Sequence, residues 1–339
     1  MAETVLVTGG AGYVAGWCIV ALLKQGYDVR ATLRNLSQAE TLRSAIATGV
    51  DGSDRLQFFA ADLTSDAGWD AAMAGCDYVL HVASPMGLDN PKDPEALSVP
   101  AREGTLRVLR AACRAGVRRV VMTSACAAAS PALYSDDGVT DETLWTDPDD
   151  PRLTSYRRSK TQAELAAWQF MKDHDGPMTL ATVLPGAVFG PVLSADRPGS
   201  VQVIGRMLQG RVLGSPRLGF EIVDVRDLAD IHLRAMTSPQ AAGQRFIAVG
   251  GFMWMAEMAQ ALRGALGTAA AKVPKRSLPD FVFRAFALID PSLRAVAPGL
   301  GRRHRHTAAK AETLLGWRPR PTAETVVACA ESLIARGMV

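Results

Sequence analysis

Short apolar runs alternate with amphipathic stretches over the first 185 residues of the chain. The apolar runs have the length and β-branched content of buried strands, and they fall at 4–8, 27–33, 56–60, 76–83, 118–124 and 178–184. The stretches between them predict helices, which we place at 17–24, 37–48, 70–75, 102–115 and 154–172. This alternation predicts an α/β protein with a doubly wound parallel sheet, a Rossmann fold.

The alternation weakens after Pro185, where glycine and proline divide the chain into short elements. A helix at 225–236 and a strand at 245–249 are expected to return to the main sheet. The tail from about residue 274 is expected to pack mainly as helices. The sequence therefore predicts a second, smaller part, mainly 186–339, that is interleaved with the first.

Composition is that of an ordinary globular protein, with 48% hydrophobic and 21% charged residues. A net charge of +3 on 339 residues is too small to indicate a nucleic-acid partner. The one basic run, Arg-Arg-His-Arg-His at 302–306, predicts a solvated loop. Its two histidines have no nearby Cys, Asp or Glu at the spacing of a metal site, so we expect no metal.

Cysteine usage indicates a reducing compartment. The five cysteines are scattered, odd in number and without a C-x-x-C pair, which is typical of free thiols. No basic segment followed by an apolar core opens the sequence, and no apolar run reaches the about 18 residues of a membrane-spanning helix. We therefore expect a soluble, cytoplasmic protein that does not bind a membrane.

A glycine cluster follows the first predicted strand. Residues 8–16 read Thr-Gly-Gly-Ala-Gly-Tyr-Val-Ala-Gly and lead directly into a helix. Gly9 allows a sharp turn, and Gly12 allows the backbone to approach a pyrophosphate without a Cβ in the way. The N–H groups at the start of the helix would face the anion. Strand, glycine turn and helix in this order predict dinucleotide binding, with Tyr13 and Val14 at the cofactor.

A tyrosine and a lysine four residues apart, Tyr156 and Lys160, lie on one face of the predicted helix 154–172. An ammonium beneath a phenol favours the phenolate, so we expect Lys160 to lower the pKa of Tyr156. Such a phenol is a usable acid near neutral pH. The pair alone is common on surface helices, but together with the glycine turn it predicts a catalytic site.

These motifs make the chain resemble the extended short-chain dehydrogenase/reductase family, and within it the dihydroflavonol 4-reductase and aldehyde (carbonyl) reductase branch. Further resembling segments are Asp62-Leu63, 81–85 (His-Val-Ala-Ser-Pro), 184–186 (Leu-Pro-Gly), 223–229 and 315–319. The resemblance implies a nicotinamide cofactor and reversible hydride transfer to an aldehyde or ketone. It implies Tyr156 as the proton donor, Lys160 as ribose anchor and tuner of the tyrosine, and a homodimer.

The choice of coenzyme depends on the residue that follows the second strand. An acidic side chain there binds the free ribose 2′-hydroxyl of NAD, but this chain has Arg34, with Arg30 and Arg43 nearby. A guanidinium suits a 2′-phosphate, so the sequence favours NADP(H). We therefore expect residues 1–185 to form mainly an NADP-binding Rossmann domain, with returning segments near 220–250.

Other cofactor contacts are expected at strand ends. Asp62 and Leu63 would lie beside the adenine, and Val82, Ala83 and Ser84 beside the ribose and pyrophosphate. The remaining expected contacts are Thr123, Tyr156, Lys160, Pro185, Gly186, Ala187 and Val188. The substrate pocket is expected to be shaped by 85–99, 130–153, 189–219 and the helix from 281.

The chain departs from the family pattern after the fifth strand. The family reads Thr-Ser-Ser, and its last serine binds the substrate carbonyl, but this chain reads Thr123-Ser124-Ala125. Losing one such donor costs about 2.7 to 4 kcal/mol of transition-state stabilisation, so an active enzyme should replace it. Candidates are Ser124, Thr123, Ser130 and a water. We choose Ser124 as nearest, although a regular strand would point it to the opposite face.

Two other functions stay open at this point. A nucleotide-sugar epimerase or dehydratase would use the same Tyr156 and Lys160 with a retained NAD, and Arg34 argues against it. A non-catalytic NADP(H)-binding regulator would account for the loss of the serine at Ala125. The leading interpretation is an NADPH-dependent carbonyl reductase whose partner is a small carbonyl or alcohol substrate.

Overall fold

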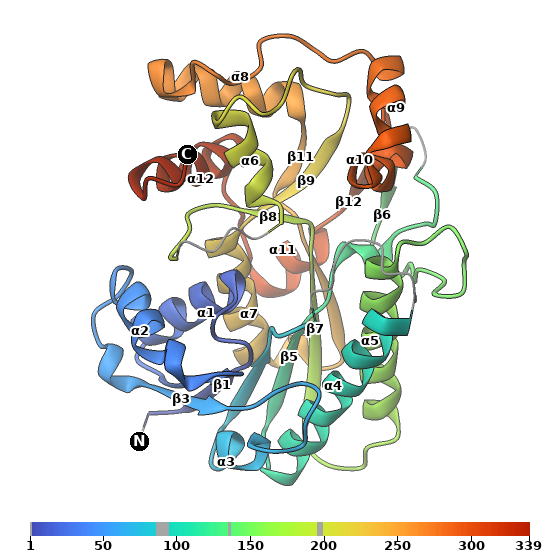
Figure 1. The fold of residues 1–339 in the computed structure, drawn as a ribbon. Coiled ribbons are helices and arrows are strands. Elements are labelled where there is room, and N and C mark those ends of the chain that lie inside the picture. Colours follow the sequence, from blue (N-terminus) through green and yellow to red (C-terminus); the bar gives the residue numbers. More distant parts are fainter. Residues whose placement is uncertain (1, 86–94, 135–136, 195–198) are drawn as a thin grey trace.

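A seven-stranded parallel sheet forms the centre of the computed structural model, which describes residues 2–85, 95–134, 137–194 and 199–339 (Figure 1). The strand order is β10-β7-β5-β4-β1-β2-β3. These strands are β1 (Thr4–Val7), β2 (Asp28–Leu33), β3 (Leu56–Ala60), β4 (Tyr78–His81), β5 (Arg119–Thr123), β7 (Thr179–Pro185) and β10 (Gln244–Ala248). The predicted doubly wound parallel sheet is confirmed.

Helices cover both faces of this sheet because side chains alternate along each strand. Val5 and Val7 join the core beneath α1 (Tyr13–Lys24), α2 (Ala39–Ala47), α7 (Val225–Thr237) and α11 (Ala309–Leu315). Leu6 joins the core beneath α3 (Trp69–Met73), α4 (Glu95–Arg114) and α5 (Ser155–Lys172). Strand β10 and helix α7 thus return to the Rossmann part, as the late apolar pattern predicted.

Helix α4 begins earlier than the sequence predicted. The prolines and acidic residues before Arg102 indicate a loop, but α4 starts at Glu95 and runs through Pro100. Its first turns bury Leu97 and Ala101, and this burial outweighs the missing proline N–H. Of the four segments expected to shape the pocket, residues 86–94, 135–136 and 195–198 lie outside the described residues.

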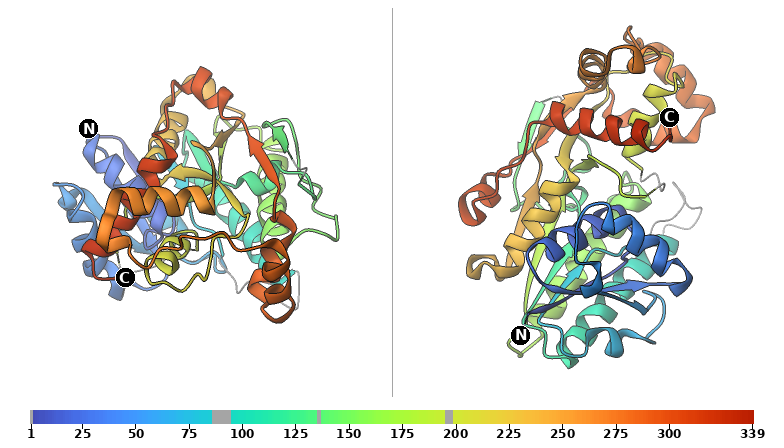
Figure 2. Two further views of the ribbon diagram at one scale, coloured as in Figure 1. Left: turned by 90° about the horizontal axis from the view of Figure 1, so that it is seen from above. Right: turned by 90° about the vertical axis from the view of Figure 1, so that its left-hand side faces the viewer.

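The second part stands above the carboxyl ends of the parallel strands (Figures 1 and 2). A three-stranded sheet in the order β11-β9-β8 shares a core with α6, α8 and α12. The elements of this part are β8 (Ala187–Phe189), α6 (Val201–Leu208), β9 (Gly219–Asp224), β11 (Gly251–Trp254), α8 (Met255–Leu266), α9 (Asp280–Ile289), α10 (Pro291–Val296) and α12 (Thr322–Ala335). Short 3-10 turns occur at Leu36–Gln38, Ser53–Arg55, Cys126–Ala129, Pro239–Ala241, Gly267–Ala270 and Ala297–Gly299.

A small parallel pair, β6 (Asp137–Thr140) with β12 (Arg303–His306), corrects one prediction. The basic run 302–306 was expected to be a solvated loop, yet its last four residues form a strand. His304 and His306 are each only 8% exposed, while Arg303 is exposed. The reason is the alternation Arg-His-Arg-His, which has the two-residue period of a strand with one buried face.

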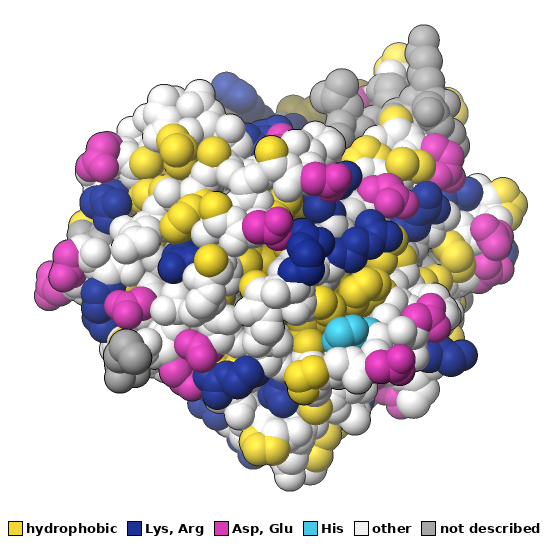
Figure 3. All heavy atoms as spheres, turned by 90° about the horizontal axis from the view of Figure 1, so that it is seen from below, with side chains coloured by type: hydrophobic (Ala, Val, Ile, Leu, Met, Phe, Trp, Pro, Cys, Tyr) yellow, Lys and Arg dark blue, Asp and Glu magenta, His cyan; other side chains and the backbone are white. Residues whose placement is uncertain are grey.

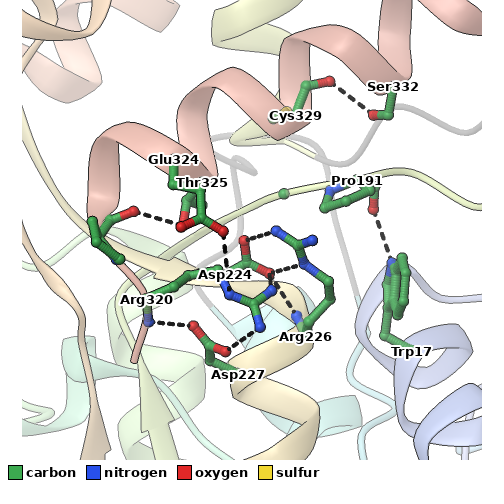
Figure 4. A network of polar contacts seen from close by, with 12 residues as sticks. Trp17, Pro191, Asp224, Arg226, Asp227, Arg320, Glu324, Thr325, Cys329 and Ser332 are labelled. Carbon is green, nitrogen blue, oxygen red and sulfur yellow. Dashed lines mark hydrogen bonds and ion pairs between the residues drawn. The ribbon is translucent and has the colours of Figure 1, made fainter. Parts of the chain in front are cut away.

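An ionic network joins the end of β9 to the start of α7 and to the segment before α12 (Figure 4). The fully buried Asp224 carboxylate caps α7 by accepting from the Arg226 N–H at 2.9 Å, and it pairs with the Arg226 guanidinium at 2.8 Å. Arg320 lies 3.3 Å from Asp224 and 2.9 Å from Asp227. Because each buried carboxylate has a cationic partner, the network holds the two parts together.

The lower face of the molecule, seen in Figure 3, carries acidic and basic side chains interspersed with apolar ones. Ion pairs at the amino ends of the strands are consistent with this mixture, since Arg118 pairs with Glu3 and, at 3.1 Å, with Asp77. A mixed surface of this kind gives no single-sign field for a polyanion on this face. Within the described part of the chain, no helix combines the length and the apolar character needed to cross a membrane.

Candidate active site

One large cleft of about 2250 Å³ is lined both by the carboxyl ends of the parallel strands and by residues of the second part. Parallel sheets bind ligands at this edge, because the loops that leave the strands meet there. Every residue predicted for the cofactor or for catalysis lines the cleft: Gly9, Gly12, Tyr13, Val14, Arg34, Asp62, Leu63, Val82, Ala83, Ser84, Thr123, Ser124, Tyr156, Lys160, Pro185, Gly186, Ala187 and Val188. The structure therefore brings the predicted residues to one place.

The glycine turn between β1 and α1 is packed too tightly for side chains at Gly9 and Gly12. Gly9 has a φ of 70°, in the left-handed region, and a Cβ there would lie 3.0 Å from the Cβ of Ala83. Gly12 is the N-cap of α1, and a Cβ on it would lie 3.1 Å from the Gly9 carbonyl oxygen. The first N–H groups of α1 have no acceptor within the helix and face this turn. The turn therefore fits a pyrophosphate.

Only one of the three arginines considered for the 2′-phosphate lines the cleft. The Arg30 guanidinium donates to the Ala74 carbonyl oxygen at 2.7 Å, and the Arg43 guanidinium donates to the Leu56 carbonyl oxygen at 2.7 Å. Arg34 is exposed and lines the cleft. The pKa of the nearby Asp62 is lowered, first by hydrogen bonds from Thr64 and further by the positive charges of Arg34 and Arg107.

Lys160 is buried on α5, and its ammonium donates to the Thr123 carbonyl oxygen at 3.2 Å. Burial lowers the pKa of Lys160 to about 8, against the opposing effect of the Glu164 charge. The Lys160 charge in turn helps burial to lower the pKa of His81 to about 3. His81 is therefore neutral at pH 7 and is held by the Thr8 hydroxyl at 2.9 Å.

The expected lowering of the Tyr156 pKa is not found. Burial raises the pKa of Tyr156 to about 12, and the thiol of Cys126 and the phenol of Tyr134 add to the rise. Tyr156 is nevertheless 42% exposed along the cleft, so water there offsets part of this effect. Lys160 points to the Thr123 carbonyl oxygen, and desolvation dominates. Tyr156 consequently keeps its proton at neutral pH, as a proton donor must.

The hydroxyls of Thr123 and Ser124 are both engaged inside the protein. Thr123 donates to His232 Nε2 at 2.7 Å, since His232 Nδ1 donates to the Leu228 carbonyl oxygen. Ser124 donates to the Glu164 carboxylate at 2.6 Å. The choice of Ser124 as the carbonyl donor therefore stays a prediction that this geometry does not favour.

Ala125 lines the cleft and is 5% exposed, so the position of the expected serine faces the site without a hydroxyl. Ser130, the more distant candidate, donates to the Cys126 carbonyl oxygen at 2.6 Å. Its oxygen also meets His306 Nε2 at 2.9 Å. Ser130 is thus a structural hydrogen-bonding group of the loop that follows β5.

The sequence missed a polar wall of the cleft formed by Tyr134, Glu221, His304 and His306. Glu221 accepts hydrogen bonds from both the backbone N–H and the ring of His306. The His304 ring stacks on Tyr134 with centroids 5.1 Å apart. The period-two pattern of 303–306 was a signal for the histidines, but nothing local marked Tyr134 or Glu221. Among the described residues, no group of three His, Cys, Asp or Glu side chains could hold a metal.

Comparison with known proteins identifies the family. The model of the NAD dependent epimerase/dehydratase family matches residues 5–250. The chain belongs to this family, the extended short-chain dehydrogenases/reductases that its motifs resemble. A cinnamoyl-CoA reductase of Medicago truncatula is 36% identical over 251 residues, covering 72% of this chain and 75% of that protein. An anthocyanidin reductase of Vitis vinifera is 33% identical over 258 residues, covering 71% and 75%.

Solved structures agree on the fold. The yeast methylglyoxal/isovaleraldehyde reductase, determined with NADPH, aligns with a TM-score of 0.81 and 24% identity, covering 99% of this chain and 100% of that chain. The Medicago truncatula and Vitis vinifera relatives, at 36% and 33% identity, are both named as reductases. The chain is accordingly an NAD(P)-dependent reductase of the extended family, on the dihydroflavonol reductase-like branch.

Proposed function

We propose that the protein is an NADPH-dependent carbonyl reductase that converts an aldehyde or ketone to an alcohol, reversibly. The observation that carries this proposal is the shared cleft, in which the phenol of Tyr156 and the buried Lys160 lie in the same space as the Gly9 turn and Arg34. The reductase names of the relatives support it. The name of the yeast structure, which includes NADPH, supports the choice of coenzyme.

The residues present fit this cofactor. Gly9, Gly12 and the start of α1 would hold the pyrophosphate, and Arg34 would hold the 2′-phosphate by charge-assisted hydrogen bonds. Asp62 and Leu63 would lie beside the adenine, with Val82, Ala83 and Ser84 beside the ribose and pyrophosphate. Lys160 would donate to the nicotinamide ribose, and residues 185–188 would contact the nicotinamide.

NADPH, when bound, supplies a hydride to the carbonyl carbon. Tyr156 donates its phenolic proton to the carbonyl oxygen, so the substrate gains one hydride and one proton and becomes the alcohol. The positive charge of Lys160 stabilises the phenolate that remains, and this stabilisation grows as the proton leaves. In the reverse direction the phenolate accepts the proton of the alcohol.

The cleft favours a medium-sized, partly apolar substrate. Its lining includes the apolar side chains of Leu133, Phe252, Phe283 and Phe286, and the wall formed by Glu221, His304 and His306 is polar. Aromatic side chains bind flat apolar groups, and the polar wall would orient the substrate within the cleft. Aryl ketones and aldehydes are therefore the first compounds to test, with aliphatic ones for comparison.

The test measures NADPH consumption with this panel of carbonyl compounds, in the wild-type protein and in Tyr156→Phe. We expect turnover in the wild type and a loss of about 100-fold or more in the variant, because the proton donor is removed. Absence of turnover with every carbonyl, or full activity in Tyr156→Phe, would overturn the proposal. NADPH binding, followed by cofactor fluorescence, should change far less than turnover, because the phenyl ring and the other expected cofactor contacts remain.

The same preparation separates the two alternatives. An epimerase would be purified with bound NAD and would turn over a nucleotide sugar without consuming NADPH. A binding regulator would bind NADPH with no turnover and would copurify with a protein partner. The homodimer implied by the family resemblance stays a prediction that light scattering would test.

A further inference from the structure

The proposed reduction leaves one hydrogen-bond donor unaccounted for. Tyr156 supplies one donor to the carbonyl oxygen, and the second position of the family pattern is the methyl group of Ala125. Thr123, Ser124 and Ser130 donate to His232, Glu164 and the Cys126 carbonyl oxygen. The Cys126 thiol is a weak donor and contacts the Leu184 carbonyl oxygen at 3.2 Å.

Tyr134 lies on the same loop, in the wall of the cleft, and is half-buried. Among the described residues no hydrogen-bond partner is found for its phenol, and the same holds for the phenol of Tyr156. Tyr156 lines the same cleft, and the Tyr134 phenol contributes to the raised pKa of Tyr156. Both phenols therefore belong to the lining of one cleft.

Two contacts hold the Tyr134 ring in place. Its ring stacks on His304 with centroids 5.1 Å apart and an interplanar angle of 20°. In the second contact, the guanidinium carbon of Arg157 lies 5.3 Å from the centroid of the Tyr134 ring. A stacked ring with a cation near it keeps few rotamers, so the hydroxyl is pre-positioned.

Arg157 also ties the loop of Tyr134 to the helix of Tyr156. It follows Tyr156 in sequence, and its guanidinium donates to the carbonyl oxygens of Ser130, Pro131 and Ala132 at 3.2, 2.7 and 3.1 Å. The two tyrosines are thus connected through one residue. Their relative placement is set by the rigid α5 and not by the loop alone.

His304 is suited to support this ring. Its Nε2 lies 3.2 Å from the Thr140 hydroxyl, which itself donates to the Ala129 carbonyl oxygen, so Nε2 carries the proton. Burial and the neighbouring His306 lower the pKa of His304. The ring is therefore neutral at pH 7, and it packs on Tyr134 without adding a charge at the site.

We propose that Tyr134 is the second hydrogen-bond donor to the substrate's carbonyl oxygen, in place of the hydroxyl that is absent at Ala125; this inference rests on the proposed reductase function. Tyr134 keeps its proton throughout, while Tyr156 transfers its own. The hydrogen bond from Tyr134 strengthens as negative charge develops on the oxygen, so it contributes to kcat more than to KM. His304 is a positioning residue that acts through the Tyr134 ring.

The test compares Tyr134→Phe with the double variant Tyr134→Phe/Ala125→Ser. We expect kcat of Tyr134→Phe to fall by about 100- to 1000-fold, the usual loss for one oxyanion donor, with little change in NADPH binding. The serine hydroxyl restored at position 125 should recover most of that loss. Tyr27→Phe, a tyrosine outside the cleft, is the matched control and should keep wild-type kcat.

Wild-type kcat in Tyr134→Phe would overturn the inference. A loss that Ala125→Ser does not recover would also overturn it, because the Tyr134 hydroxyl would then act somewhere other than at the carbonyl oxygen. These outcomes differ from failure of the proposed function, in which the wild-type protein reduces no carbonyl and Tyr156→Phe makes no difference.

Discussion

The Ser124 hydroxyl donates a 2.6 Å hydrogen bond to the Glu164 carboxylate, in the interior between β5 and α5. Ser124 follows β5 directly, and alternation along that strand turns its side chain away from the face presented by Ala125. Glu164 also accepts from Thr182 at 2.7 Å and pairs with Arg245 at 2.8 Å. The serine retained from the Thr-Ser-Ser pattern is therefore part of a buried ionic cluster.

Ser124→Ala should weaken folding and leave catalysis nearly intact. Loss of a hydrogen bond to a charged acceptor costs about 1.5–3 kcal/mol, so the free energy of unfolding in urea should fall by that amount. Because Tyr156, Lys160 and Tyr134 are untouched, kcat at a temperature where the variant is folded should stay within about threefold of wild type. A drop of 100-fold or so in kcat at unchanged stability would instead place Ser124 at the carbonyl.

Glu164→Leu should be strongly destabilising. Its carboxylate is fully buried and faces Arg245, which is 7% exposed, so removal leaves a buried cation without a counter-charge. Breaking such a pair should lower the free energy of unfolding, measured in urea, by about 3–5 kcal/mol. Glu164→Gln, which keeps the shape and the hydrogen-bonding oxygen, should lose less.

The matched control is Asp70→Leu, from a pair with Arg114 in which both side chains are more than half exposed. Exposed pairs contribute about 0–1 kcal/mol. Equal losses for Glu164→Leu and Asp70→Leu would show that the Glu164 cluster does not carry the stability assigned to it.

The sequence predicted the sheet and the cofactor side of the cleft because their signals are local. Apolar runs identify strands, and the turn at Gly9 needs residues that stand next to each other in the chain. Strand ends of a parallel sheet meet at one edge, so Asp62 and Val82 could be placed without knowing side-chain contacts.

The substrate side could not be predicted in the same way, because its partners are far apart in sequence. Ser130 and His306 meet across 176 residues, and Arg157 reaches Tyr134 from a helix that follows the loop. The expected lowering of the Tyr156 pKa was wrong for a similar reason. A four-residue spacing fixes the helix face, but it does not report that burial raises the pKa of Tyr156 or that the Lys160 ammonium donates to the Thr123 carbonyl oxygen.

Arg34→Ala should weaken the binding of NADPH and leave the binding of NADH nearly unchanged. Arg34 alone of the three candidate arginines lines the cleft, and a charge-assisted contact with a 2′-phosphate is worth about 1.5–3 kcal/mol. KM for NADPH should therefore rise by about 10- to 100-fold, while KM for NADH changes little. Arg43→Ala is the control, because its guanidinium bonds the Leu56 carbonyl oxygen. If Arg34→Ala and Arg43→Ala changed the ratio of the two KM values, for NADPH and for NADH, by the same factor, Arg34 would not be the residue that binds the 2′-phosphate.

The pH dependence of reduction should come from Lys160 and not from His81 or His232. Burial lowers the pKa of His81 to about 3 and that of His232 to about 4, so both stay neutral between about pH 5.5 and 7.5, and kcat/KM should be flat there. Lys160, with its pKa lowered to about 8, is charged below that pH and loses its charge above it. Tyr156, with a raised pKa, stays protonated throughout.

A neutral Lys160 no longer stabilises the phenolate of Tyr156, so kcat/KM should fall as the pH rises through about 8. The fall should lie slightly higher in the NADPH complex, because the negative phosphates of the bound cofactor favour the charged amine. The measurement is kcat/KM for the carbonyl substrate at saturating NADPH across this range. Lys160→Met should be slower and should lose the alkaline fall, because the titrating group is gone. If kcat/KM of the wild type changed near pH 6.5, the titrating group would not be Lys160. The same conclusion would follow if kcat/KM of Lys160→Met still fell at alkaline pH.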